Sequence, residues 1–185
     1  MIQMKNVIIF HGSGETSQSF WYPYIKRELE ARGYVVAIPH LPDSEIDPDL
    51  KKCLPVVLAQ NYRKDTILIG HSSGCPLILS VLENIDIKIK LAILVAGFST
   101  ALPGDDGVNP ILQESYNWPK IANHVEDMIF INSDNDPWGC DDKQGKQMLE
   151  NLGKGRLILK KGEGHMGSDR FNQPYKEFPE LLTLV

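Results

Sequence analysis

The sequence predicts an α/β domain in which about six mostly parallel strands are covered by helices on both faces. Short apolar runs, which indicate strands, alternate along the chain with segments of helical periodicity. These runs are uniformly apolar, as expected for parallel strands that are buried on both faces. With 185 residues the chain can bury a sizeable core, so we expect residues 1–185 to form a single domain.

Each expected strand is a short run of apolar residues that ends in a turn-forming or small residue. The first, Asn6 to Phe10, leads into a turn that begins His11-Gly12-Ser13-Gly14, and the second is closed by Pro39. The six expected strands cover residues 6–10, 34–38, 66–70, 91–95, 128–131 and 157–159.

Helices are expected between these strands. Ser19 to Arg32 places apolar side chains at i, i+4 and i+8, and Gly33 follows as a stop signal. Asp47 and Pro48 are expected to begin the next helix as N-cap and first residue, and Pro55 is expected to kink or divide it. Further helices are expected after the third strand and over residues 118–125, 141–152 and 174–182.

Composition and charge exclude several classes of protein. The net charge is −5 and no basic cluster is present, so we expect no nucleic-acid partner. No segment approaches the length of a membrane span, so we expect no membrane association. The three cysteines are odd in number and none are paired at metal-ligand spacing, which favours free thiols and a cytoplasmic protein.

The strongest motif is Gly70-His71-Ser72-Ser73-Gly74, which has the form G-x-S-x-G between an expected strand and an expected helix. This arrangement is typical of a nucleophile elbow, where the glycines remove clashes at a sharp strand-to-helix turn. Ser72 would then stand exposed at the tip of a strained turn. The alternatives are a Gly/Ser-rich loop or a phosphate-binding turn at a helix N-terminus.

A serine nucleophile requires a base and an acid, and both follow expected strands. His165 lies after the sixth strand, where an isolated histidine would otherwise suggest a surface or capping role. Asp134 and Asp136 follow the fifth strand, and we favour Asp136 as the acid and Asp134 as a turn former. The order Ser, Asp, His is that of the α/β-hydrolase triad. A carboxylate partner is expected to raise the pKa of His165 above about 6.5.

The oxyanion of such an enzyme is bound by backbone N–H groups. Ser73, at the start of the helix after Ser72, should supply one, and Ser13, after the first strand, should supply the other. His11 is expected to form a supporting hydrogen bond, and His71 to pack or to bond a loop. No spacing of acidic residues and histidines suggests a metal site.

The chain resembles the small, lidless α/β-hydrolases that include the retinoblastoma-binding serine hydrolase and its bacterial relatives of the YdeN type. The most specific features are His71-Ser72-Ser73-Gly74-Cys75-Pro76 and Val95-Ala96-Gly97-Phe98. The resemblance implies a compact α/β-hydrolase fold without a cap domain, with Ser72 as nucleophile, Asp136 as acid and His165 as base. The remaining matching segments are 20–21, 41–43, 133–137 and 162–165. Two positions depart from the family pattern, Trp138-Gly139-Cys140 after the acid and Met166 after the histidine.

The expected function is a serine hydrolase that cleaves a small ester, thioester or activated amide without a cofactor. Its partner would be a small-molecule acyl substrate, whereas a protein partner and the oligomeric state stay open. The alternatives are a non-enzymatic protein-interaction module that keeps the fold, and C–C bond hydrolysis or lyase chemistry on the same triad. The loop from Gly97 to Pro119 is expected to form a pocket wall with Phe98, Leu102, Ile111, Tyr116 and Trp118.

Overall fold

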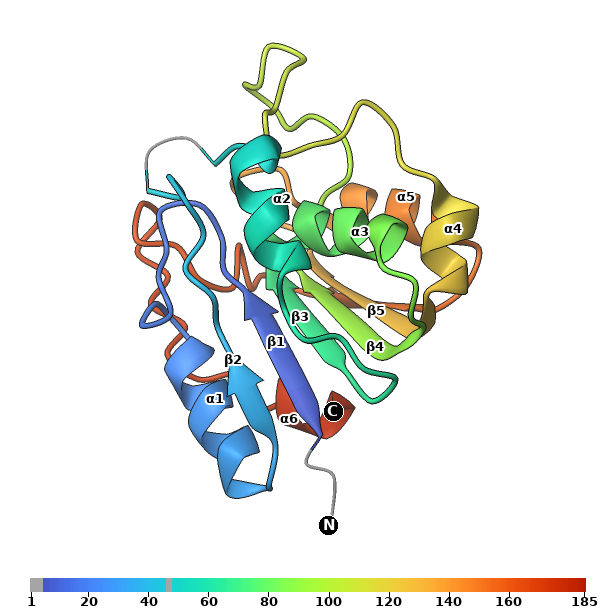
Figure 1. Cartoon of the computed structure of the whole chain (residues 1–185). Helices are drawn as coiled ribbons and strands as arrows, with labels where there is room; N and C mark the ends of the chain where they lie inside the picture. The colour runs from blue at the N-terminus through green and yellow to red at the C-terminus, as the bar shows by residue number, and fades with distance from the viewer. Residues whose placement is uncertain (1–4, 46–47) are drawn as a thin grey trace.

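A six-stranded parallel sheet with helices on both faces is the framework of the protein (Figure 1). The structure is a computed structural model, and it describes residues 5–45 and 48–185. The strand order is β2-β1-β3-β4-β5-β6, and every neighbouring pair is parallel, which confirms the predicted class. The strands are β1 (Asn6–Phe10), β2 (Val35–Ala37), β3 (Ile67–His71), β4 (Ile89–Val95), β5 (Val125–Ser133) and β6 (Arg156–Lys160).

The helices divide into two layers. Helices α1 and α6 contact each other on one face of the sheet, and α2, α3, α4 and α5 cover the other face in a row (Figure 1). They comprise α1 (Tyr22–Ala31), α2 (Leu50–Leu58), α3 (Gly74–Asn84), α4 (Trp118–Asn123), α5 (Asp142–Leu152) and α6 (Leu181–Leu184).

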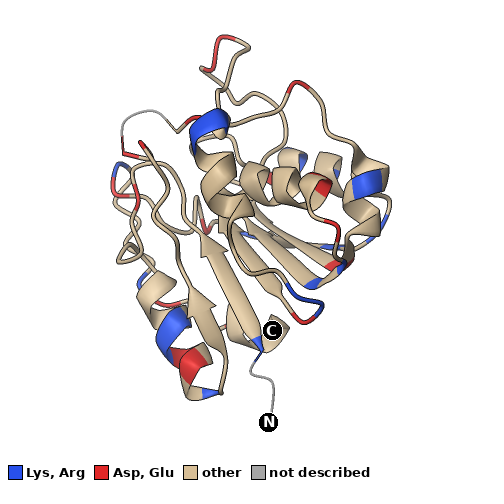
Figure 2. Cartoon of the chain, in the orientation of Figure 1, with Lys and Arg blue, Asp and Glu red and all other residues tan. Residues whose placement is uncertain are grey.

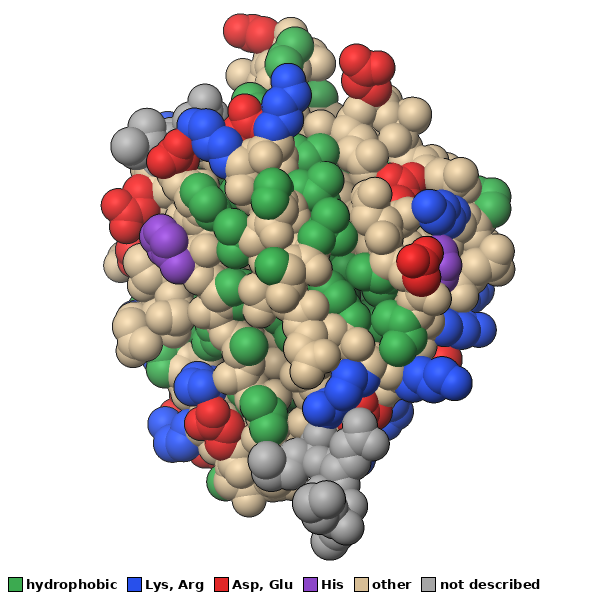
Figure 3. Space-filling model, in the orientation of Figure 1, with side chains coloured by type: hydrophobic (Ala, Val, Ile, Leu, Met, Phe, Trp, Pro, Cys, Tyr) green, Lys and Arg blue, Asp and Glu red, His purple; other side chains and the backbone are tan. Residues whose placement is uncertain are grey.

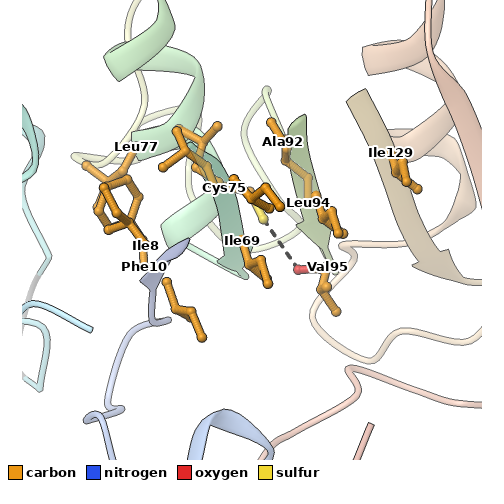
Figure 4. Close-up of a cluster of buried hydrophobic side chains, with 14 of the residues drawn as sticks. Ile8, Phe10, Ile69, Cys75, Leu77, Ala92, Leu94, Val95 and Ile129 are labelled. Atoms are coloured by element: carbon orange, nitrogen blue, oxygen red, sulfur yellow. Dashed lines mark hydrogen bonds between the residues drawn. The ribbon is translucent and has the colours of Figure 1, made fainter. Parts of the chain in front are cut away.

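The central strands are apolar on both faces because both faces are covered. Ile8, Ile69 and Leu94 are buried, and so is nearly all of α3, which packs on β1, β3 and β4 (Figure 4). The Cys75 thiol at the start of α3 donates to the Val95 carbonyl at 3.4 Å. This packing explains why the strand sequences lack polar alternation.

The second helix begins at Leu50, two residues later than predicted. Asp49 is the N-cap, and its carboxylate accepts from the Lys51 N–H at 2.7 Å. The predicted cap, Asp47, lies outside the described residues. Pro55 lies inside α2 and does not divide it, although a proline within a helix removes one N–H bond and crowds the carbonyl four residues earlier. The next turn continues with the Ala59 N–H on the Pro55 carbonyl.

The predicted C-terminal helix over residues 174–182 is wrong. Only Leu181–Leu184 are helical, and residues 174–178 are irregular. Pro174 and Pro179 each lack a backbone N–H and force the preceding residue away from helical geometry. Tyr175 also has a positive φ of 35°. The two prolines therefore prevent the predicted helix over most of its length.

The other predicted elements are present with shifted ends. Strands β4 and β5 begin two and three residues earlier than predicted, because Ile89 and Val125 pair with each other across the ladder. The remaining helices that were predicted with residue limits lie within three residues of those limits. The loop after β4 projects beyond the sheet at the top of Figure 1.

Charged side chains of both signs are scattered over the molecule. Figure 2 shows acidic residues at the tip of the projecting loop and mixed charges on α1. In the space-filling view, no single-sign patch covers the face that is presented (Figure 3). Among the residues that the structure describes, no helix is both long enough and apolar enough to cross a bilayer.

Candidate active site

Ser72 occupies a strained turn between β3 and α3. Its φ is 51°, in the left-handed region that a residue with a Cβ rarely adopts. Its own N–H donates to the Val95 carbonyl at 3.0 Å, which ties the turn to β4. A Cβ at Gly70 would lie 3.0 Å from the Gly74 backbone, and one at Gly74 would lie 2.1 Å from the Phe10 carbonyl oxygen. The two glycines therefore permit the close approach that a nucleophile elbow requires.

Gly74→Ala should destabilise the protein by about 3 kcal/mol or more, because the new methyl group would collide with the backbone of β1 and neither element can move freely. The matched control is Gly33→Ala, where a Cβ meets no atom but φ is +82°. Strain alone should cost about 1 kcal/mol there. Urea unfolding of both variants measures the difference, and equal losses would contradict the packing argument.

His165 and Asp136 form a buried hydrogen-bonded pair. His165 Nδ1 lies 2.7 Å from Asp136 Oδ2, and the other carboxylate oxygen accepts from the Trp138 N–H at 2.8 Å. The backbone N–H of His165 donates to the Gln173 side-chain oxygen at 2.8 Å. Each partner is thus oriented by a contact outside the pair, as a catalytic base and its acid require.

Asp134 lies elsewhere, on the exposed side of the same loop. Its carboxylate accepts from the Gly162 N–H at 2.8 Å. Beside it, the Asn135 side-chain oxygen accepts from the Gly164 N–H at 2.8 Å. These contacts join the loop after β5 to the loop after β6, which carries His165. Asp134 is therefore a loop-forming residue, and Asp136 is the carboxylate that faces the imidazole.

A cavity of about 340 Å³ opens beside Ser72 and His165. Ser13 and Ser73 also line it, and the Ser13 hydroxyl donates to Ser73 Oγ at 3.0 Å. The loops after β1, β3 and β6 thus place four of the five predicted site residues at one cavity, with Asp136 behind His165. The apolar part of the wall consists of Phe20, Phe98, Leu102, Ile111 and Trp138.

The projecting loop contributes to this wall as predicted, but only in part. Phe98, Leu102 and Ile111 line the cavity, whereas Tyr116 and Trp118 do not. The rings of these last two residues pack on each other at 5.7 Å. Between them the Asn117 N–H is anchored by the Glu83 carboxylate on α3, which turns this end of the loop away from the cavity.

The predicted direction of the His165 pKa is wrong. Burial is the largest influence, and it lowers the pKa because it disfavours the imidazolium. The hydrogen bond to Asp136 raises the pKa, and the nearby His71 lowers it again. The net pKa of His165 lies below its ordinary value of 6.5. Burial depends on tertiary packing and was not visible in the sequence.

Sequence reasoning missed Glu15, a buried carboxylate that also lines the cavity. Its Oε1 lies 3.0 Å from His71 Nδ1, and the Tyr22 hydroxyl donates to its Oε2. The available signal was its isolation, since Glu15 is the one acidic or basic residue between Lys5 and Lys26 apart from His11. His71 forms a loop hydrogen bond, as expected, through its Nε2 to the His165 carbonyl at 2.9 Å. His11 also forms a loop contact, because its Nε2 accepts from the Leu41 N–H at 3.3 Å.

Cys140 lies close to the pair formed by Asp136 and His165. One potential metal-ligand atom from each of these three residues lies within 4.8 Å of the others. However, the carboxylate and the imidazole already bond each other, and burial raises the pKa of Cys140 well above its ordinary value. A neutral thiol is a poor metal ligand. The donor set therefore fits a hydrogen-bonded pair better than a cation site.

Comparison with known proteins agrees with this geometry. A family model described as serine hydrolase matches residues 7–184. YdeN from Bacillus subtilis (strain 168) is 32% identical over 136 residues, which cover 71% of this chain and 71% of that protein. The crystal structure of the B. subtilis ydeN gene product has a TM-score of 0.87 at 26% identity, with 98% of this chain and 96% of that chain covered.

A second solved structure shares the fold at lower identity. A YdeN-like protein from Pectobacterium atrosepticum has a TM-score of 0.70 at 16% identity, over 97% of this chain and 88% of that chain. Together with the elbow and the family model, which spans nearly the whole sequence, these likenesses establish that the chain belongs to the YdeN-type serine hydrolases and is an enzyme of the α/β-hydrolase fold.

Proposed function

We propose that the protein hydrolyses a small ester, thioester or activated amide through an acyl-enzyme on Ser72. The observation that carries this proposal is the single cavity that Ser72, His165, Ser13 and Ser73 share, with Asp136 bonded to His165. A serine at a strained turn, next to an imidazole that is held by a carboxylate, is the arrangement that activates a hydroxyl as a nucleophile.

The proposed reaction begins with attack of Ser72 Oγ on the substrate carbonyl carbon. Because His165 Nδ1 faces Asp136, the free Nε2 is the nitrogen that takes the Ser72 proton. The carbonyl oxygen becomes an oxyanion, which the N–H groups of Ser73 and Ser13 stabilise. The His165 imidazolium then protonates the leaving group, and water, activated by His165, releases the acid. These steps involve no cofactor.

The cavity favours small acyl groups. A volume of about 340 Å³ lies at the lower end of the range for ligand pockets, and its apolar part is formed by large side chains. We expect p-nitrophenyl acetate and butyrate to be hydrolysed with at least about tenfold higher kcat/KM than the laurate, since the longer chain cannot be enclosed.

A panel of p-nitrophenyl esters, thioesters and aminoacyl amides tests both the reaction class and the acyl length. No helical cap covers the site in the described chain, so we expect no jump in rate when a long ester passes its micelle point. Interfacial activation, or a preference for the long esters, would contradict the small-acyl assignment.

Activity should fall on the acid side through protonation of His165. Only the neutral imidazole can take the Ser72 proton, and the pKa of His165 lies below 6.5, so full activity should persist to a pH below that value. The pH dependence of kcat/KM on a soluble short-chain ester measures this limb. A profile that is flat down to about pH 4, with chemistry rate-limiting, would remove His165 from the proposed role.

A further inference from the structure

Glu15 is a buried carboxylate with a complete set of hydrogen-bond donors. Its carboxylate accepts from the Gly12 N–H at 2.6 Å, from the Tyr22 hydroxyl, and from His71 Nδ1 at 3.0 Å. Burial alone would raise the pKa of Glu15, but His71 and the hydrogen bonds more than offset it, so the pKa is lowered. This set of donors suits an ionised carboxylate, which only accepts hydrogen bonds.

His71 is completely buried, and both of its ring nitrogens face acceptors. Nδ1 faces the Glu15 carboxylate, and Nε2 lies 2.9 Å from the backbone oxygen of His165. A neutral imidazole has one N–H and can satisfy only one of these acceptors, whereas the imidazolium satisfies both. The Tyr22 hydroxyl, 3.0 Å from Nδ1, has a single proton, which it gives to Glu15.

The pKa directions agree with this geometry. Burial lowers the pKa of His71. The Glu15 charge and the hydrogen bonds to the two acceptors raise it by a larger amount, so the net pKa of His71 is raised. Burial and the Glu15 charge raise the pKa of Tyr22 well above its ordinary value, so its hydroxyl keeps the proton. A buried ion pair with satisfied hydrogen bonds is the arrangement that tolerates burial.

These contacts join three segments of the proposed active site. Glu15 binds Gly12, next to the oxyanion donor Ser13, and His71 directly precedes Ser72. On the opposite side of the His71 ring from Glu15, Nε2 bonds the backbone oxygen of His165. We propose that Glu15 and His71 form a permanent buried ion pair that positions the loop of the base and keeps His165 in its neutral, proton-accepting form. This inference rests on the proposed function for its catalytic consequence, but the ion pair itself can be tested without it.

The sign of the electrostatic effect follows from distance. The ring centroids of His71 and His165 are 4.9 Å apart, whereas Glu15 bonds the Nδ1 side of the His71 ring. The His71 charge, which lowers the pKa of His165, therefore acts on it more strongly than the Glu15 charge, which raises it. The net effect of the pair is to disfavour a second imidazolium. The other titratable groups around Glu15, His71 and His165 are Tyr22, His11, Cys75, Asp136 and Cys140.

The protonation state of His71 can be measured directly. Nitrogen NMR of the histidine side chains in the wild-type protein, assigned with a His71→Gln variant, should show both His71 nitrogens protonated from about pH 5 to 8. His165 should be neutral over most of that range. A His71 that is neutral at pH 7 would overturn the ion pair, and this result does not depend on any catalytic activity.

The catalytic consequence is tested with Glu15→Gln, which keeps the shape but removes the charge. The amide oxygen can still accept from Gly12 and Tyr22, and its NH₂ can donate to a neutral His71. Losing the cation should move the acid limb of kcat/KM, or of fluorophosphonate labelling, to higher pH. At a pH on the acid limb of the wild-type profile, we expect the substitution to lower the rate at least about threefold more than it does at pH 8.

A matched control separates charge at the site from loss of any buried glutamate. Glu83→Gln removes a buried carboxylate that anchors Asn117 and Gln113, far from His165, and should lower the melting temperature without moving the acid limb. An unmoved limb in folded Glu15→Gln would overturn the tuning role. If Glu15→Gln does not fold, the NMR measurement on wild type still decides the ion pair. An absence of labelling in wild type would defeat the proposed function and leave the NMR test intact.

Discussion

Ser72→Ala should abolish covalent labelling by an aryl fluorophosphonate and lower kcat for ester hydrolysis by a factor of about 10⁶. The expected loss is this large because the proposed acyl-enzyme needs the Ser72 oxygen, and no neighbouring hydroxyl has the same elbow, base and oxyanion site. The fold should persist, because serine and alanine both carry a Cβ and therefore experience the same backbone strain at a φ of 51°. Mass spectrometry of the labelled protein, with circular dichroism of the variant, measures both outcomes.

Ser80→Ala is the matched control for this experiment. Ser80 lies on α3, the helix that follows Ser72, where its hydroxyl donates to the Pro76 carbonyl at 3.0 Å, away from the cavity. Its loss should cost about 1 kcal/mol of stability and leave labelling intact. An adduct on any serine other than Ser72 would contradict the elbow assignment. A folded wild-type protein that does not react at all would favour the protein-interaction alternative.

Asp136→Asn should lower kcat by a factor of about 10⁴, which is the loss that the equivalent substitution causes in a chymotrypsin-like serine protease. Asp136 accepts from His165 Nδ1, so it selects the tautomer with a free Nε2 and stabilises the imidazolium that forms later. An asparagine that turns its NH₂ toward Nδ1 selects the opposite tautomer. Steady-state kinetics on a short-chain ester measures the loss in protein whose folding is verified by thermal melting.

Asp134→Asn is the control for the acid, two residues away in the same loop. Its carboxylate bonds the Gly162 N–H on the exposed surface and does not contact His165. We expect most of kcat/KM to remain and the melting temperature to fall slightly, because about 1 kcal/mol of hydrogen bonding is weakened. If Asp134→Asn were the inactive variant and Asp136→Asn the active one, the acid would be the earlier aspartate.

The features that could be predicted from the sequence are those whose physical cause is local. A buried parallel strand must be apolar along its length, so β1, β3 and β4 were recognisable as runs. A strand that turns sharply into a helix needs glycines, which is why Gly70 and Gly74 marked Ser72. Since the carboxyl ends of parallel strands share one edge, Ser72, Asp136 and His165 were expected together from their positions alone.

Features that depend on the neighbours of a residue could not be predicted in this way. The side chains of Glu15 and His71 meet across 56 residues of sequence, and no spacing rule connects the two. The pKa of His165 is lowered because packing removes water from the ring, so its carboxylate partner did not decide the sign.

The sequence by itself therefore determined the parallel sheet, the elbow at Ser72 and the edge at which the site lies, because backbone geometry restricts which residues can occupy those positions. The sequence also favoured Asp136 over Asp134 as the acid, whereas the tertiary structure alone decided that the pKa of His165 is lowered and that Glu15 and His71 lie beside the base. Those outcomes depend on distances between segments far apart in the chain, and burial sets their energies.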